Sequence, residues 1–107
     1  AAYWQAHDER VRCTFDMAHS TFAGDEPVAE ARLLRGRTAH VHLRDAVPGD
    51  SRRLYGQGQV DFRSIVGLFR ESGYRGYYSL EFPVMTTAEE GDQRLAEHLE
   101  FFADFEF

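Results

Sequence analysis

The sequence contains no lysine, because all twelve of its basic residues are arginine, and only one cysteine, Cys13. A single cysteine rules out an internal disulfide. Cys13 lies among the apolar positions of a short alternating segment, which favours a buried, unreactive thiol over a nucleophile. We therefore expect a cytoplasmic protein, in a compartment where thiols stay reduced.

Long apolar runs and an excess of positive charge are also missing. No stretch approaches the ~20 apolar residues that a membrane-spanning helix needs, and no signal-peptide pattern opens the chain. The formal net charge is −6, whereas nucleic acids and anionic membranes are bound largely by concentrated positive charge. We therefore expect neither nucleic acid nor a membrane as a partner.

Apolar residues make up 43% of the 107 residues. This share is enough for one core, so we expect residues 1–107 to form a single domain. The sequence does not open with Met, and residues 1–10 have the composition of the last turns of a helix whose beginning is absent. This pattern predicts that the domain is incomplete.

Three segments alternate apolar and polar residues with the period of two that is typical of β-strands. In the central segment, 38–45, His40 and His42 share one face while the residues between and after them are apolar. The flanking segments 11–16 and 77–82 follow the same pattern. The polar face of each segment ends on a potential metal ligand, and these ligands are Asp16, His42 and Glu81.

The sequence predicts a helix after each of the three strands. The first has Asp25 or Glu26 at its N-cap, Pro27 in its first turn and Gly36 just past its end. Residues 17–25, between the first strand and this helix, are predicted to form a loop.

The second helix is the clearest, since Asp61 can cap it, Gly73 ends it, and apolar residues recur at i, i+3, i+4 and i+7. These residues are Phe62, Ile65, Val66 and Phe69. The third helix has the spacing of a capping box at Thr87 and Glu90. Its expected core stripe consists of Leu95, Leu99 and Phe102. Residues 46–60 are predicted to form a long polar loop.

Strands that alternate with helices indicate an α/β fold with parallel strands and right-handed crossovers. Parallel strands bring their carboxyl ends to one side, so Asp16, His42 and Glu81 are expected to meet at one edge of the sheet. Three parallel strands would also expose unpaired backbone groups at both outer strands. We therefore expect a missing barrel portion, or a second copy of the chain, to complete the sheet.

Four segments resemble the xylose isomerase-like barrels of the sugar-phosphate isomerase/epimerase group, in the same order and at similar spacing. The segments are 14–19 (TFDMAH), 39–45 (AHVHLRD), 55–62 (YGQGQVDF) and 73–81 (GYRGYYSLE). The resemblance implies that the chain is the C-terminal portion of a (β/α)8 TIM barrel, about strands six to eight with their helices.

The resemblance also implies a metal-dependent sugar or sugar-phosphate isomerase or epimerase. Asp16, His42 and Glu81 would bind one divalent metal ion together with a glutamate outside this sequence. Two carboxylates and one imidazole suit Mn²⁺, Co²⁺, Mg²⁺ or Zn²⁺. Such an ion binds a keto sugar and stabilises an enediolate while a carboxylate moves the proton next to the carbonyl, and Glu81 is the candidate acid/base.

Further candidates for the substrate site come from two groups of residues. His19 resembles the family's histidine that contacts a substrate hydroxyl, so it is a candidate for both catalysis and substrate binding. Arg44, Arg52 and Arg53 are candidates for binding a phosphate or carboxylate of the substrate.

Each ligand candidate also has a structural interpretation. Asp16 could cap the turn after its strand, and His42 could be a hydrogen-bonded core residue. Glu81 has the weakest such interpretation, because a carboxylate on a buried strand is costly unless it is paired or bound to a metal. His40 is interpreted as an interior group that either packs in the core or supports a ligand side chain, and Asp45 as a residue that orders its loop.

The other polar features have simpler interpretations. Gly56 and Gly58 primarily predict a turn. A phosphate-binding loop is the weaker interpretation of the same two residues. His7 and His98 lie among charged residues of predicted helices, and both are expected to be solvated.

Two other functional classes stay open. The same barrel group includes endonuclease IV-type DNA-repair enzymes, but their zinc cluster needs further histidines, and none lies between His42 and His98. A chain with three of eight strands is also consistent with a non-catalytic remnant, or with a half-barrel that needs a partner.

Overall fold

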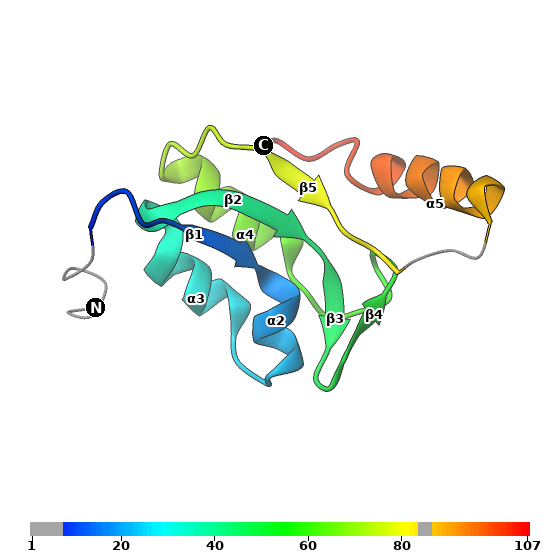
Figure 1. The fold of residues 1–107 in the computed structure, drawn as a ribbon, viewed down its shortest axis with the longest axis horizontal. Helices are drawn as coiled ribbons and strands as arrows, with labels where there is room; N and C mark the ends of the chain where they lie inside the picture. Colours follow the sequence, from blue (N-terminus) through cyan, green and yellow to red (C-terminus); the bar gives the residue numbers. More distant parts are fainter. Residues whose placement is uncertain (1–7, 84–86) are drawn as a thin grey trace.

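A computed structural model describes residues 8–83 and 87–107 of the chain (Figure 1). Its centre is a three-stranded parallel sheet in the order β1 (Cys13–Asp16), β2 (Thr38–Leu43) and β5 (Tyr78–Leu80). The predicted α/β class and the parallel strand direction are therefore confirmed.

Two helices, α3 (Pro27–Leu34) and α4 (Phe62–Glu71), cover one face of this sheet (Figure 1). The core between the two layers includes Phe15, Val41, Leu43, Ile65 and Phe69. Because side chains alternate along a strand, burying these residues turns the polar residues of β1 and β2 to the opposite face. That face carries the candidate site.

The predicted helix starts agree with the structure. Side-chain oxygens of Glu26, Asp61 and Thr87 accept hydrogen bonds from backbone N–H groups in the first turns of α3, α4 and α5 (Ala88–Phe101). These caps satisfy donors that have no partner inside the helix. Gly36, expected just past α3, lies in a short 3₁₀ helix, η1 (Arg35–Arg37).

The prediction of a loop over 17–25 is wrong in its first part, where α2 (Met17–Phe22) forms. The carboxylate of Asp16 caps this helix, and Met17 and Ala18 are fully buried in its first turn. The helix is short, so its apolar period is too brief to stand out in the sequence.

The loop prediction over 46–60 is also wrong in its first part. A hairpin forms there from β3 (Asp45–Val47) and β4 (Asp50–Arg53). Pro48 and Gly49 make its turn, and Gly49 has a φ of +78°, which glycine adopts without steric cost. The strand β4 is almost entirely polar, so it lacks the alternation that marks a half-buried strand.

The expected core stripe on α5 is only partly correct. Phe102 is buried, but Leu95 and Leu99 are 41% and 56% exposed. His98, expected in solvent, is instead only 3% exposed, because its ring packs against Tyr55 and Phe82. Figure 1 shows α5 to one side of the sheet, beyond the carboxyl end of β5.

The observed strands are shorter than predicted. The first strand begins at Cys13 and not at Val11, which is 58% exposed. Cys13 itself is half-buried, whereas a buried thiol was expected. Of the helix tail predicted over residues 1–10, residues 1–7, with His7, lie outside the described residues, and residues 8–10 form a turn and no helix. No helix in the described ranges is long and apolar enough to cross a membrane.

Candidate metal centre

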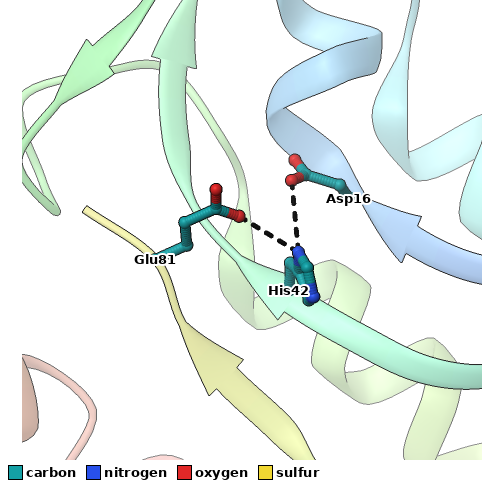
Figure 2. A group of neighbouring side chains, drawn as sticks. All are labelled: Asp16, His42 and Glu81. Atoms are coloured by element: carbon teal, nitrogen blue, oxygen red, sulfur yellow. Dashed lines mark hydrogen bonds and ion pairs between the residues drawn. The ribbon is translucent and has the colours of Figure 1, made fainter. Parts of the chain in front are cut away.

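Asp16, His42 and Glu81 meet at the carboxyl ends of three neighbouring strands (Figure 2). The Nδ1 atom of His42 lies 3.0 Å from Oε2 of Glu81 and 3.7 Å from Oδ2 of Asp16. One ligand atom from each residue lies within 4.8 Å of the other two. The predicted convergence of these three side chains is therefore what the structure shows.

The register of the sheet accounts for this arrangement. Asp16 is level with His42 across β1 and β2, and His42 is level with Ser79 across β2 and β5. Glu81 follows Ser79 by two residues, so its side chain has the same phase as Ser79 and points to the same face. Parallel pairing thus brings three side chains from distant parts of the sequence together.

Asp16 caps the helix that follows its strand and also faces the other two ligand candidates. Its Oδ1 accepts hydrogen bonds from the backbone N–H groups of Ala18 and His19, at 2.8 and 3.3 Å. Its Oδ2 faces His42. The side chain is only 7% exposed, so the cap of α2 fixes the carboxylate in the orientation that the site needs.

The three side chains fit a divalent cation. Metal bonds of ~2.1 Å place neighbouring ligand atoms about 3.0–3.4 Å apart, close to the distances around His42 Nδ1. Two carboxylates and one imidazole nitrogen form a mostly oxygen donor set that accepts several divalent ions. A cation between them would also neutralise two carboxylates that otherwise lie side by side.

Arg44 connects the site to a neighbouring cavity. Its Nη1 lies 3.3 Å from Oε1 of Glu81, and its Nε and Nη2 donate to the backbone and side-chain oxygens of Ser51. A cavity of about 340 Å³ opens beside this ion pair. Its lining consists of Arg44, Ser51, Arg52, Glu81, Phe82 and Pro83.

The other candidate residues lie at different distances from the three ligands. His19 stands on α2 with a 76% exposed side chain, and its Nε2 is 3.9 Å from Oδ2 of Asp16. Arg53 forms an ion pair with Asp50 at 3.0 Å and does not line the cavity. The structure thus brings His19 to the site and directs Arg53 to the β3–β4 hairpin.

His40 lies one step deeper on the same face of β2. Its Nε2 is 2.7 Å from the hydroxyl of Ser79, and its ring meets the ring of His42 edge-on at 5.2 Å. It therefore supports the imidazole of His42 from below, as its interpretation as a supporting interior group predicted.

Comparison with known proteins agrees with this geometry. A family model described as "Xylose isomerase-like TIM barrel" matches residues 1–105. The chain belongs to the xylose isomerase-like TIM barrel family. A crystal structure of a xylose isomerase domain protein from Planctomyces limnophilus shares the fold, with a TM-score of 0.79 at 20% identity over 94% of this chain and 39% of that one.

Other relatives in the family have more specific names. The chain is 36% identical to the rhizopine catabolism protein MocC of Rhizobium meliloti, over 68% of this chain and 28% of the relative. It is 26% identical to inosose dehydratase of Clostridium tetani, over 66% of this chain and 30% of the relative. A D-tagatose 3-epimerase-like protein matches with a TM-score of 0.64 at 27% identity, over 91% of this chain and 38% of that one.

The chain therefore spans about a third of the length of the proteins that it matches.

Asp45 orders the loop after the β3–β4 hairpin, as predicted. It is 1% exposed, and its carboxylate accepts hydrogen bonds from the backbone N–H groups of Gly56 and Gly58, at 2.9 and 3.0 Å, and of Val60 at 3.3 Å. These glycine amides are therefore occupied by an internal carboxylate, which favours the turn over a phosphate-binding loop.

The sequence analysis did not identify Tyr55 as a residue that contacts the site. Its hydroxyl donates to the backbone oxygen of Leu43 and lies 3.0 Å from the backbone N–H of Glu81. Burial raises the pKa of the Tyr55 phenol well above its usual value, so it stays protonated. The only signal in the sequence was an aromatic residue before the Gly56-Gln57-Gly58 turn.

Proposed function

We propose that this chain provides the metal-binding part of a sugar or sugar-phosphate isomerase or epimerase. The observation that carries the proposal is the meeting of Asp16, His42 and Glu81 at the carboxyl ends of adjacent parallel strands, where barrel enzymes place their catalytic groups. The name of the D-tagatose 3-epimerase-like relative supports this reaction class, and that of the inosose dehydratase supports only a sugar-like substrate.

The side chains around the site suggest distinct roles in this chemistry. A divalent ion held by the three ligands would polarise the carbonyl and adjacent hydroxyl of a keto sugar. Glu81, whose side chain is 42% exposed, would remove the proton next to that carbonyl and return it. Arg44 holds its second oxygen, and the exposed His19 can donate or accept a hydrogen bond at a substrate hydroxyl.

The cavity beside Glu81 supports an anionic substituent on the substrate. Arg44 and Arg52 both line it, and guanidinium groups bind phosphate or carboxylate through paired hydrogen bonds. A binding role for Arg53 stays a prediction, because this residue pairs with Asp50.

We further propose that the chain corresponds to about strands six to eight of the barrel. Within the described residues, β1 and β5 each pair with one strand only, and the matched relatives are about three times longer. The remaining barrel would then supply both missing neighbours and a fourth ligand. A half-barrel that acts only with a partner, or a non-catalytic remnant, is the second candidate on the same observation.

A zinc cluster of the endonuclease IV type has less support. His98 is buried among aromatic rings, and the Nε2 of His40 is engaged with Ser79. Among the other described histidines, only the exposed His19 approaches a ligand candidate with a ring nitrogen that has no other contact, at 3.9 Å from Asp16, whereas a zinc cluster needs several further ligands.

A Mn²⁺ titration followed by paramagnetic broadening of NMR signals tests the metal site. We expect signals of Asp16, His42 and Glu81 to broaden first, with weak affinity because the chain supplies only three ligands. Glu81→Gln should weaken binding by more than the roughly tenfold that loss of an outer-shell partner costs. Glu89→Gln, the same change on an exposed part of α5, should have no effect. Equal responses of the two variants would contradict the proposed metal site. Tight stoichiometric binding would contradict only the proposal that a fourth ligand comes from a missing barrel portion.

Proton transfer is tested separately in a completed barrel. In D₂O with Mn²⁺, a keto sugar should exchange the hydrogen next to its carbonyl, and Glu81→Gln should abolish this exchange. If exchange persists in this variant, Glu81 is not the acid/base.

A further inference from the structure

The phenol of Tyr55 occupies the gap between the ends of two strands that carry ligands. Its hydroxyl contacts the backbone oxygen of Leu43, which directly follows His42, and both the backbone N–H and backbone oxygen of Glu81 at 3.0 Å. One side chain therefore contacts peptide groups that adjoin two of the three metal-ligand candidates.

The position of the hydroxyl coincides with the end of regular strand pairing. β2 and β5 pair up to Leu43 and Leu80, and no strand follows over residues 81–83. Beyond that point, the backbone N–H of Glu81 is held by the oxygen of Leu43 and by the Tyr55 hydroxyl, both at 3.0 Å. The backbone hydrogen bond from Glu81 to Leu43 thus extends the β2–β5 contact by one residue, and the phenol braces this last bond by contacting both of its groups.

Packing leaves the Tyr55 ring little freedom. The residue is 8% exposed, and its ring meets the rings of Phe62, His98 and Phe102 at centroid distances of 5.5, 4.7 and 4.9 Å. Its neighbour Gly56 donates its backbone N–H to the buried carboxylate of Asp45. The hydroxyl is consequently a rigid reference point, fixed by α4, α5 and the loop.

Of the three ligand candidates, Glu81 has the least support from its own surroundings, so an additional contact affects its position most. Asp16 is fixed by its cap of α2, and His42 lies within the central strand. The carboxylate of Glu81 stands on a longer, 42% exposed side chain just past a strand end. A small shift of its backbone would therefore change its distance from His42 Nδ1.

We propose that Tyr55 is a positioning residue for Glu81, which sets the distance between the Glu81 carboxylate and His42 and thereby the affinity of the site for a divalent ion. The metal part of this inference rests on the proposed function. The backbone part does not, because it concerns contacts of the chain alone.

Tyr55→Phe tests the inference, with Tyr74→Phe as the matched control. Both changes remove one hydroxyl and keep the ring, but the Tyr74 hydroxyl donates to the backbone oxygen of Tyr77, before β5 and away from the site. In metal-free protein, the Glu81 amide of Tyr55→Phe keeps its bond to the Leu43 oxygen but loses the phenol that braces it. Its hydrogen exchange should therefore accelerate, by up to about fivefold to tenfold, and should not change in Tyr74→Phe.

Metal affinity provides the second measurement. The Mn²⁺ dissociation constant, from NMR broadening of the folded protein, should rise about tenfold in Tyr55→Phe and stay constant in Tyr74→Phe. Equal effects of the two variants on both measurements would overturn the inference. If the unaltered chain binds no Mn²⁺, the proposed function fails, and the Glu81 amide alone decides whether Tyr55 positions this residue.

Discussion

Gly58 lies directly against the buried Asp45 in the loop that carries Tyr55. A Cβ atom added at Gly58 would lie 2.1 Å from Oδ1 of Asp45 and 2.5 Å from the backbone oxygen of Ala46. Both atoms belong to a buried segment that already binds the loop amides. Neither atom can move without breaking hydrogen bonds.

Gly58→Ala should therefore lower the free energy of unfolding by about 1–3 kcal/mol, the usual cost of overpacking. Gly67→Ala is the control, since nothing lies within 4 Å of its added Cβ inside α4, and it should stabilise the protein by up to about 1 kcal/mol. Urea denaturation measures both. A neutral Gly58→Ala would mean that the loop is not held by Asp45.

At the same scale, the three ligand candidates were predictable, whereas the residues that support them were not. Alternation along a strand and the common direction of parallel strands suffice to place Asp16, His42 and Glu81 at one edge. The contact between Tyr55 and Glu81 joins residues that are 26 positions apart and belong to a loop and a strand end. Only the packed structure specifies such a contact.

Helices and strands with a clear periodic pattern of apolar residues were predicted correctly, and those without one were missed. α4 was predicted accurately because Phe62, Ile65, Val66 and Phe69 all face the core and Asp61 caps the helix. α2 was missed because it is short, and β4 because it is polar. For α5, the prediction chose the wrong buried face. The helix buries His98 against aromatic rings, whereas Leu95 and Leu99 are exposed.

The burial of His98 predicts a pH dependence of stability that belongs to α5. Burial lowers the pKa of His98 below its usual 6.5, although Glu97 partly opposes this shift, and within the described residues the ring nitrogen Nε2 has no hydrogen-bond partner. The unfolded chain therefore binds the proton more readily than the folded protein does. The stability that neutral His98 contributes is present above about pH 6.5 and is lost as the pH falls toward the folded-state pKa.

Urea midpoints between pH 7.5 and 5 measure this effect. His98→Phe should reduce the loss of stability on acidification, by at most about 1.4 kcal/mol per pH unit for one proton. Equal slopes for the variant and the unaltered protein would show that His98 is accessible to protons in the folded state.

At the scale of the whole molecule, the outer strands of the sheet and the leucines of α5 are exposed, although single domains usually cover such groups. Each outer strand, β1 and β5, pairs with one neighbour in the described part of the chain, and such edges readily pair with further strands. Leu95 and Leu99 add an exposed apolar stripe on α5. These features fit a segment that completes its sheet against more chain, either the rest of a barrel or another copy.

The chain on its own should therefore self-associate, with a sedimentation coefficient that rises with concentration. Leu99→Glu should weaken association by roughly tenfold or more, because an unpaired charge buried in a contact costs more than about 1.4 kcal/mol. Gln93→Glu adds the same charge at another exposed position of α5 and should have little effect. A concentration-independent monomer with a cooperative thermal transition would contradict this expectation, since it would mean that three parallel strands and their helices are stable without a partner.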